Sequence, residues 1–164
     1  MWTVTQTHRF RAAVAGAGIA DWLSYYGENS IDEWMIPFFG ASVYDNPAVY
    51  AKSSPINYIK QVNTPTLVIV GERDGECPAP QSFEFWHALQ TQHVQTQLAV
   101  YPGQGHRFRD PEDRIDRMRR TLAWFNRYLG ESAGQNGRSE GNSGGRLVTP
   151  ERTRRDPTRE QGEK

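Results

Sequence analysis

Two short segments place a carboxylate and a histidine where nucleophilic catalysis could use them. Asp74 stands in GERDGECP, directly after the apolar run 66–70, and His106 stands in YPGQGH, directly after the apolar run 98–101. If both runs are neighbouring parallel strands, the two side chains meet beyond their carboxyl ends, where doubly wound sheets place active sites. The aspartate would then orient one imidazole nitrogen and leave the other as a general base.

Simpler roles compete with this interpretation. An Asp-Gly pair commonly forms a turn, and a histidine in a glycine-rich segment can be an ordinary loop residue. Glu72 and Glu76 are rival carboxylates in the first segment. We favour Asp74 and His106 as the reacting pair because both follow an apolar run in a loop of small and polar residues.

No metal or cofactor is expected at this site. The four histidines and the single cysteine show no metal-ligand spacing. The glycines of the segment AGAG at 15–18 form only part of a dinucleotide-binding pattern and lack its third glycine. Cys77, directly before Pro78, is interpreted as a packed thiol rather than a nucleophile.

The elements that would position the pair alternate between strands and helices. The apolar runs 12–17, 66–70 and 98–101 are typical of parallel strands that are covered on both faces. A helix is expected after Pro80, where Phe83, Trp86 and Leu89 recur at helical spacing. Together these elements predict a parallel, doubly wound α/β sheet.

The last helix of this region has clear ends. Asp110 and Pro111 predict its N-cap and first position, and Gly130 predicts its end. An apolar stripe at helical spacing is interpreted as its core face. The stripe consists of Ile115, Met118, Leu122, Phe125 and Leu129.

The segment 19–60 is rich in aromatic residues and proline, and we expect it to leave the sheet as a long excursion. Short helices are predicted at 31–39 and 47–52. Aromatic excursions above a sheet often shape pockets, although a purely structural cover explains the same composition.

Composition divides the chain at Gly130. Residues 1–130 are predicted to form one domain, and residues 131–164 a disordered polar tail, because that segment contains too few apolar side chains for a core. The formal net charge of zero predicts neither a nucleic-acid nor a membrane partner. One cysteine excludes an internal disulfide and fits a reducing compartment, so we expect a cytoplasmic location.

Several motifs in this order resemble the C-terminal part of the prolyl oligopeptidase catalytic domain, a serine peptidase family with an α/β-hydrolase fold. The motifs are G-x-x-D-x-x-x-P around Asp74 and Y-P-x-x-x-H ending at His106, with RFRAAVAGAGIADW and SSPINYIKQVNTPTLVIVGERD before them. The acylaminoacyl-peptidase and dipeptidyl-peptidase branches are the most similar. The resemblance extends over nearly all of residues 1–130.

This resemblance implies a Ser-Asp-His triad of which the chain supplies Asp74 and His106. It also implies a nucleophilic serine in a G-x-S-x-G turn, before the helix that begins here at Met1. No such turn stands in residues 1–130, and Ser143, in the glycine-rich segment GNSGG of the predicted tail, follows no apolar run that could be a strand, so the early strands and the nucleophile elbow are expected to lie outside this chain. By the same resemblance, Trp22, Tyr25 and Tyr26 would line the substrate pocket.

The implied activity is hydrolysis of short or N-blocked peptides through an acyl-enzyme. A carboxylesterase or dienelactone-hydrolase-like enzyme is an alternative with the same fold, and a catalytically inactive fragment is a second. A sheet of only three strands would leave an edge exposed, which favours self-association through that edge.

Overall fold

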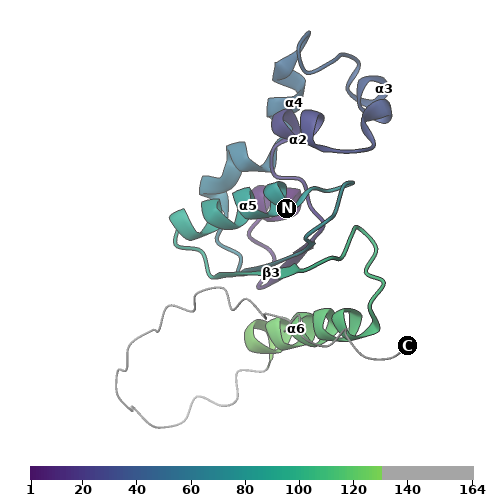
Figure 1. Cartoon of the computed structure of the whole chain (residues 1–164). Helices are drawn as coiled ribbons and strands as arrows, with labels where there is room; N and C mark the ends of the chain where they lie inside the picture. The colour runs from purple at the N-terminus through teal and green to yellow at the C-terminus, as the bar shows by residue number, and fades with distance from the viewer. Residues whose placement is uncertain (131–164) are drawn as a thin grey trace, which may run out of the picture. The chain divides into compact units, whose positions relative to one another are not determined.

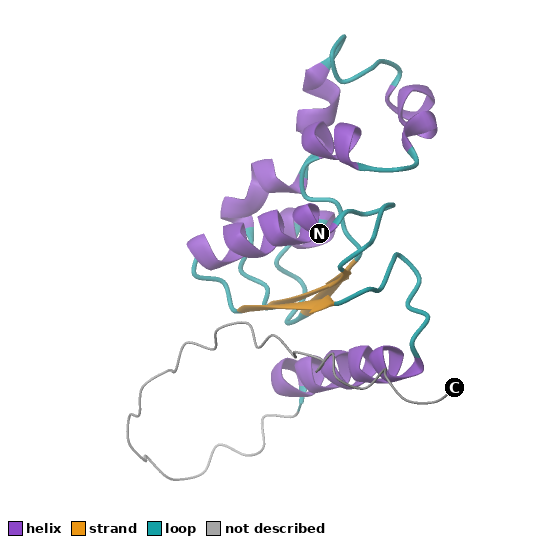
Figure 2. Ribbon diagram, in the orientation of Figure 1, coloured by secondary structure: helices purple, strands orange, loops and turns teal. Residues whose placement is uncertain are grey.

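A computed structural model of the chain describes residues 1–130, and the predicted disordered tail, 131–164, lies outside the described residues. Figure 2 shows helices surrounding one small sheet. In chain order the elements are α1 (Trp2–Gln6), β1 (Ala13–Gly16), α2 (Trp22–Glu28), η1 (Asp32–Trp34), α3 (Met35–Phe39), α4 (Pro47–Ser53), η2 (Pro55–Gln61), β2 (Thr66–Gly71), α5 (Ala79–Thr91), β3 (Thr96–Tyr101) and α6 (Pro111–Leu129).

The sheet has three parallel strands in the order β1-β2-β3. Val14 pairs with Leu67, and Ile69 pairs with Ala99. All six residues of the central strand β2 are buried, because α5 covers one face of the sheet and α6 the other (Figure 1). The predicted parallel, doubly wound α/β arrangement is therefore confirmed.

Alternate residues of β2 supply the cores on the two faces of the sheet. Val68 packs with Phe85 and Leu89 of α5 on one face. Leu67 and Ile69 pack on the opposite face in a cluster that contains Trp124 of α6. Successive side chains of a strand point to opposite faces, so one apolar run serves both cores.

One edge of the sheet is formed by β1, which pairs only with β2 within the described residues. Self-association through this edge remains a prediction. None of the described helices combines the length and the apolar character that a membrane span requires.

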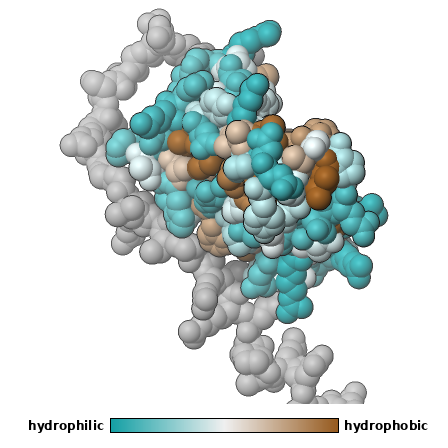
Figure 3. Space-filling view, turned by 90° about the horizontal axis from the view of Figure 1, so that it is seen from above, coloured by the Kyte–Doolittle hydropathy of each residue, from teal (hydrophilic) through white to brown (hydrophobic). Residues whose placement is uncertain are grey.

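The excursion between β1 and β2 contains the expected short helices. The predicted helix at 31–39 is a 3-10 turn, η1, followed by α3, and the helix predicted at 47–52 is α4. Tyr25, Met35 and Tyr50 form a separate buried cluster there. Figure 3 views the molecule from above, over this segment, and shows hydrophobic residues exposed among hydrophilic ones. Within the segment, the Phe38 side chain is exposed.

The interpretation of the apolar stripe on α6 as core is confirmed for Phe125, which packs against the core cluster of Trp124, and is wrong for the other four residues. Met118 is 61% exposed and Leu122 is 60% exposed, and Ile115 and Leu129 are exposed as well. The helix instead faces the sheet with Trp124, whose indole Nε1–H donates to the Pro65 carbonyl at 3.3 Å. Phe125 and Tyr128 pack beside Trp124 in the same cluster, so the aromatic side of α6 lies against the sheet and its aliphatic side chains point outward.

The buried face of α5 agrees with the apolar spacing at Leu89, which is buried, and at Trp86, which packs against the same core, but differs at one position. Phe85 and Leu89 are fully buried, whereas Phe83 is exposed. Gln81 and Ser82 lie on the buried side with them. Because polar residues also lie on the buried side of α5, apolar spacing alone does not identify that side.

We predict that replacing Met118 and Leu122 together with glutamate changes the free energy of unfolding of the chain by about 0.5 kcal/mol or less. Both side chains are already exposed, so little buried area is lost. Replacing Trp124 with alanine should cost about 3–5 kcal/mol. Urea unfolding followed by circular dichroism measures both, and equal losses in the two variants would mean that the stripe is buried.

Candidate active site

The turn after β2 fixes a buried aspartate. The Asp74 N–H donates to the Gly71 carbonyl at 3.2 Å, which closes the turn. Asp74 Oδ1 accepts the backbone N–H groups of Glu76 at 3.0 Å and Cys77 at 2.8 Å. An aspartate that bonds the backbone just ahead of it is typical of a tight turn, and here it holds the carboxylate in one orientation.

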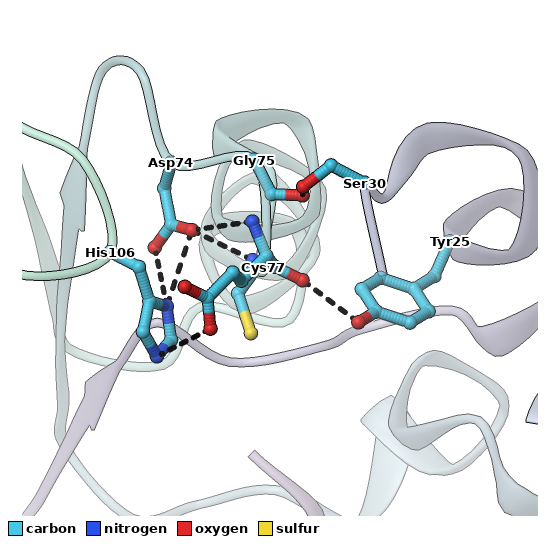
Figure 4. Close-up of polar contacts among 7 residues, drawn as sticks. Tyr25, Ser30, Asp74, Gly75, Cys77 and His106 are labelled. Atoms are coloured by element: carbon cyan, nitrogen blue, oxygen red, sulfur yellow. Dashed lines mark hydrogen bonds and ion pairs between the residues drawn. The ribbon is translucent and has the colours of Figure 1, made fainter. Parts of the chain in front are cut away.

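The same carboxylate contacts His106, which comes from the loop after β3 (Figure 4). His106 Nδ1 lies 3.2 Å from Asp74 Oδ1 and 3.1 Å from Oδ2. The Asp74 side chain is 1% exposed and the His106 side chain is 35% exposed, so the aspartate contacts the imidazole from the protein interior. With its proton on Nδ1, the imidazole has Nε2 available as a base.

The two loops meet closely because residue 71 is a glycine. A Cβ placed on Gly71 would lie 2.5 Å from the carbonyl oxygens of both Gln104 and Gly105. The Arg73 N–H donates to the Gln104 carbonyl at 2.8 Å and joins the loops. This close approach of the two backbones brings Asp74, which follows β2, into contact with His106, which follows β3.

The two rival carboxylates occupy different places. Glu72 accepts the Gly103 N–H at 2.9 Å and so supports the histidine loop. Glu76 Oε2 lies 3.7 Å from His106 Nε2, on the side of the ring opposite Asp74. Only Asp74 contacts Nδ1, which is the position that orients the ring.

Tyr25 has a role that its sequence context did not reveal. Its ring is buried, and its hydroxyl donates to the Glu76 carbonyl at 2.8 Å. Ser30 donates from its hydroxyl to the neighbouring Gly75 carbonyl at 2.9 Å. Both residues therefore brace the turn that carries Asp74, and no local motif singles either of them out for that task.

The predicted pocket residues lie together in the aromatic cluster of the excursion. Trp22 and Tyr26 are partly buried and pack against the aromatic cluster around Tyr50, while Tyr25 points inward. Trp22 contacts Trp34 edge to face, with ring centroids 5.9 Å apart. Their role in substrate binding remains a prediction.

We predict that replacing Tyr25 with phenylalanine lowers the free energy of unfolding by about 1 kcal/mol, because the part-buried Glu76 carbonyl loses its donor. The matched control is Tyr58, whose hydroxyl makes an exposed bond to the Lys52 carbonyl. Replacing Tyr58 with phenylalanine should lower the free energy of unfolding by a smaller amount, since water can take the place of the hydroxyl. Denaturant unfolding compares the two, and a larger loss for Tyr58 would contradict the bracing role.

Cys77 is placed as a packed thiol. Burial raises its pKa to about 11, and the carboxylates of Asp74 and Glu76 add to the increase. A thiol with such a pKa stays protonated at neutral pH and is a poor nucleophile. This agrees with the interpretation of Cys77 from the sequence.

His106 also lines a cavity of about 360 Å³ between the sheet and α6. Gly16 and Ala17 at the end of β1 form one part of its wall, and Phe108 and Arg117 form another. The Arg117 guanidinium lies 4.9 Å from the centre of the Phe108 ring. His106 is therefore accessible from this cavity.

Comparison with known proteins identifies the family of the chain. The chain is 32% identical to the uncharacterized peptidase YuxL of Bacillus subtilis over 135 residues, which cover 78% of the chain and 20% of YuxL. It is 30% identical to the acylamino-acid-releasing enzyme of Homo sapiens over 128 residues, which cover 74% of the chain and 18% of that enzyme. The chain thus spans about a fifth of these relatives.

Solved structures agree with this result. The acylaminoacyl peptidase of Pyrococcus horikoshii superposes with a TM-score of 0.74 at 28% identity, over 82% of this chain and 23% of that one. A puromycin-hydrolyzing peptidase of Mycobacterium tuberculosis superposes with a TM-score of 0.72 at 26% identity, over 77% of this chain and 20% of that one. The family model of the prolyl oligopeptidase family matches residues 1–132. The chain belongs to the prolyl oligopeptidase family of serine peptidases.

Proposed function

We propose that the intact protein that carries this chain is a serine-type peptidase and that Asp74 and His106 are two members of its triad. The observation that carries the proposal is the contact of His106 Nδ1 with the buried Asp74 carboxylate, beyond the carboxyl ends of adjacent parallel strands. Family membership supports the same chemistry. The catalytic roles of both residues are part of this proposal.

In the proposed reaction a serine from outside residues 1–130 attacks the carbonyl carbon of the scissile bond. His106 Nε2 takes the hydroxyl proton and then gives it to the leaving amine, so that an acyl-enzyme remains. Water, activated by the same nitrogen, releases the acyl group and restores the serine. Asp74 stabilises the imidazolium that forms in each half of the reaction.

Short or N-blocked peptides are the proposed substrates. Relatives named as acylamino-acid-releasing enzymes support this class and do not favour the carboxylesterase alternative. Trp22 and Tyr26 are proposed to contribute to the pocket. A cytoplasmic location, which the single cysteine favours, belongs to the same proposal.

The test compares the purified 164-residue chain with the intact protein. The intact protein should cleave N-acetyl peptides and react with a fluorophosphonate probe, and His106→Ala should abolish both activities. The chain alone should cleave neither peptide nor ester substrates, since residues 1–130 contain no G-x-S-x-G turn and the GNSGG segment at 141–145 follows no apolar run of the kind that precedes a nucleophile elbow. An intact protein that reacts with neither peptide nor probe would refute the proposal. Turnover by the chain alone, abolished by His106→Ala, would contradict the external serine.

A further inference from the structure

We propose that Glu76 determines specificity for the residue directly after the scissile bond, favouring a positive charge there and disfavouring a negative one. This inference rests on the proposed peptidase function. It concerns the leaving-group side of the site.

The position of the carboxylate relative to the imidazole carries the argument. Glu76 Oε2 lies 3.7 Å from His106 Nε2. In the proposed reaction this nitrogen donates its proton to the departing amine, so the first residue of the leaving group must pass beside it. A charge on that residue therefore comes within a few ångströms of the Glu76 carboxylate.

The backbone of Glu76 is held in place from both sides. Its N–H donates to Asp74 Oδ1 at 3.0 Å, and its carbonyl accepts the Tyr25 hydroxyl at 2.8 Å. The preceding residue, Gly75, is held in turn by Ser30. The side chain can change rotamer, but its point of attachment cannot leave the vicinity of His106.

The Glu76 carboxylate is available to a substrate. Its side chain is 47% exposed, and among the described residues its carboxylate has one polar partner, the His106 ring. The Asp74 carboxylate, in contrast, is buried and already bonded to two backbone N–H groups and to the ring. Glu76 is thus the acidic group of the site that can still bind a cation or repel an anion.

The test uses the intact peptidase and three N-acetyl peptides that differ only in having Arg, Gln or Asp directly after the scissile bond. In the wild-type protein kcat/KM should follow the order Arg, Gln, Asp. In Glu76→Gln, which keeps the size of the side chain, the ratio of kcat/KM for the Arg substrate to kcat/KM for the Asp substrate should fall about tenfold. Glu112→Gln is the matched control. Glu112 is exposed at the start of α6, and its replacement removes the same charge from the protein.

The two proposals fail in different ways. If no peptide is cleaved by the wild-type protein, the peptidase function is wrong and this inference falls with it. If all three are cleaved but the ratio stays unchanged in Glu76→Gln, or falls equally in Glu112→Gln, only the role of Glu76 is refuted.

A measurement on the wild-type protein removes any dependence on how the variant folds. Raising the ionic strength from about 0.02 M to about 0.5 M screens charges at a half-exposed site. The preference for the Arg over the Asp substrate should decline over this range, while the rate with the Gln substrate changes less. A preference that does not depend on salt would overturn the electrostatic origin.

Discussion

Replacing Asp74 with asparagine is expected to lower kcat of the intact peptidase by about four orders of magnitude, as the same change does in a Ser-His-Asp triad. The structure supplies a specific reason. Oδ1 accepts two backbone N–H groups, so the asparagine must keep its oxygen there. Its NH₂ group then points at His106 Nδ1 and donates to it, which forces the imidazole proton onto Nε2 and removes the general base.

Initial rates with an N-acetyl peptide measure this effect. Thermal unfolding should show little loss of stability, because the turn keeps its backbone bonds. Asp32→Asn, in the exposed turn η1, is the matched control and should leave kcat within about twofold of the wild-type value. A near-normal rate for Asp74→Asn would exclude Asp74 from the triad.

Replacing Gly71 with alanine should impair both stability and catalysis. The new methyl group would lie 2.5 Å from two backbone carbonyl oxygens, those of Gln104 and Gly105, and neither can rotate away as a side chain could. The loop that carries His106 must therefore move. We expect a loss of about 1–3 kcal/mol in the free energy of unfolding. A shift of about 1 Å in the imidazole should lower kcat/KM of the intact protein about a hundredfold.

The matched control is Gly27→Ala. Gly27 lies within α2 and no atom would lie within 4 Å of its added Cβ, so this variant should be as stable as the wild type or more so. Urea unfolding and peptide kinetics on the two variants separate crowding at Gly71 from a general effect of losing a glycine. Wild-type stability and activity in Gly71→Ala would show that the loops do not approach as closely as described.

Much of the framework could be predicted from the sequence because its signals are local. Uninterrupted apolar runs indicated the three parallel strands, and the residues Asp110, Pro111 and Gly130 indicated the ends of α6. In the structure Asp110 caps that helix by accepting the Glu112 N–H at 2.8 Å, and Gly130 follows its last residue. Strand order then placed Asp74 and His106 at one end of the sheet, where they are found in contact.

The orientation of the helices could not be predicted in the same way. On α6, an aliphatic stripe and an aromatic face both recur at helical spacing, and the sheet receives the aromatic face with Trp124. On α5, Phe85 is buried and Phe83 is not. Periodicity shows that a helix has an apolar side, but the shape of the opposing surface decides which side is buried.

The sequence by itself therefore determined the fold class, the family and the two residues expected to react, since each depends on short motifs and their order along the chain. Only the tertiary structure decided which groups support and surround them. The bond from Tyr25 to the Glu76 carbonyl and the approach of Gly71 to residues 104–105 join segments far apart in the chain. Such contacts depend on how packed elements meet in space, and the spacing of residue types along the chain does not predict that geometry.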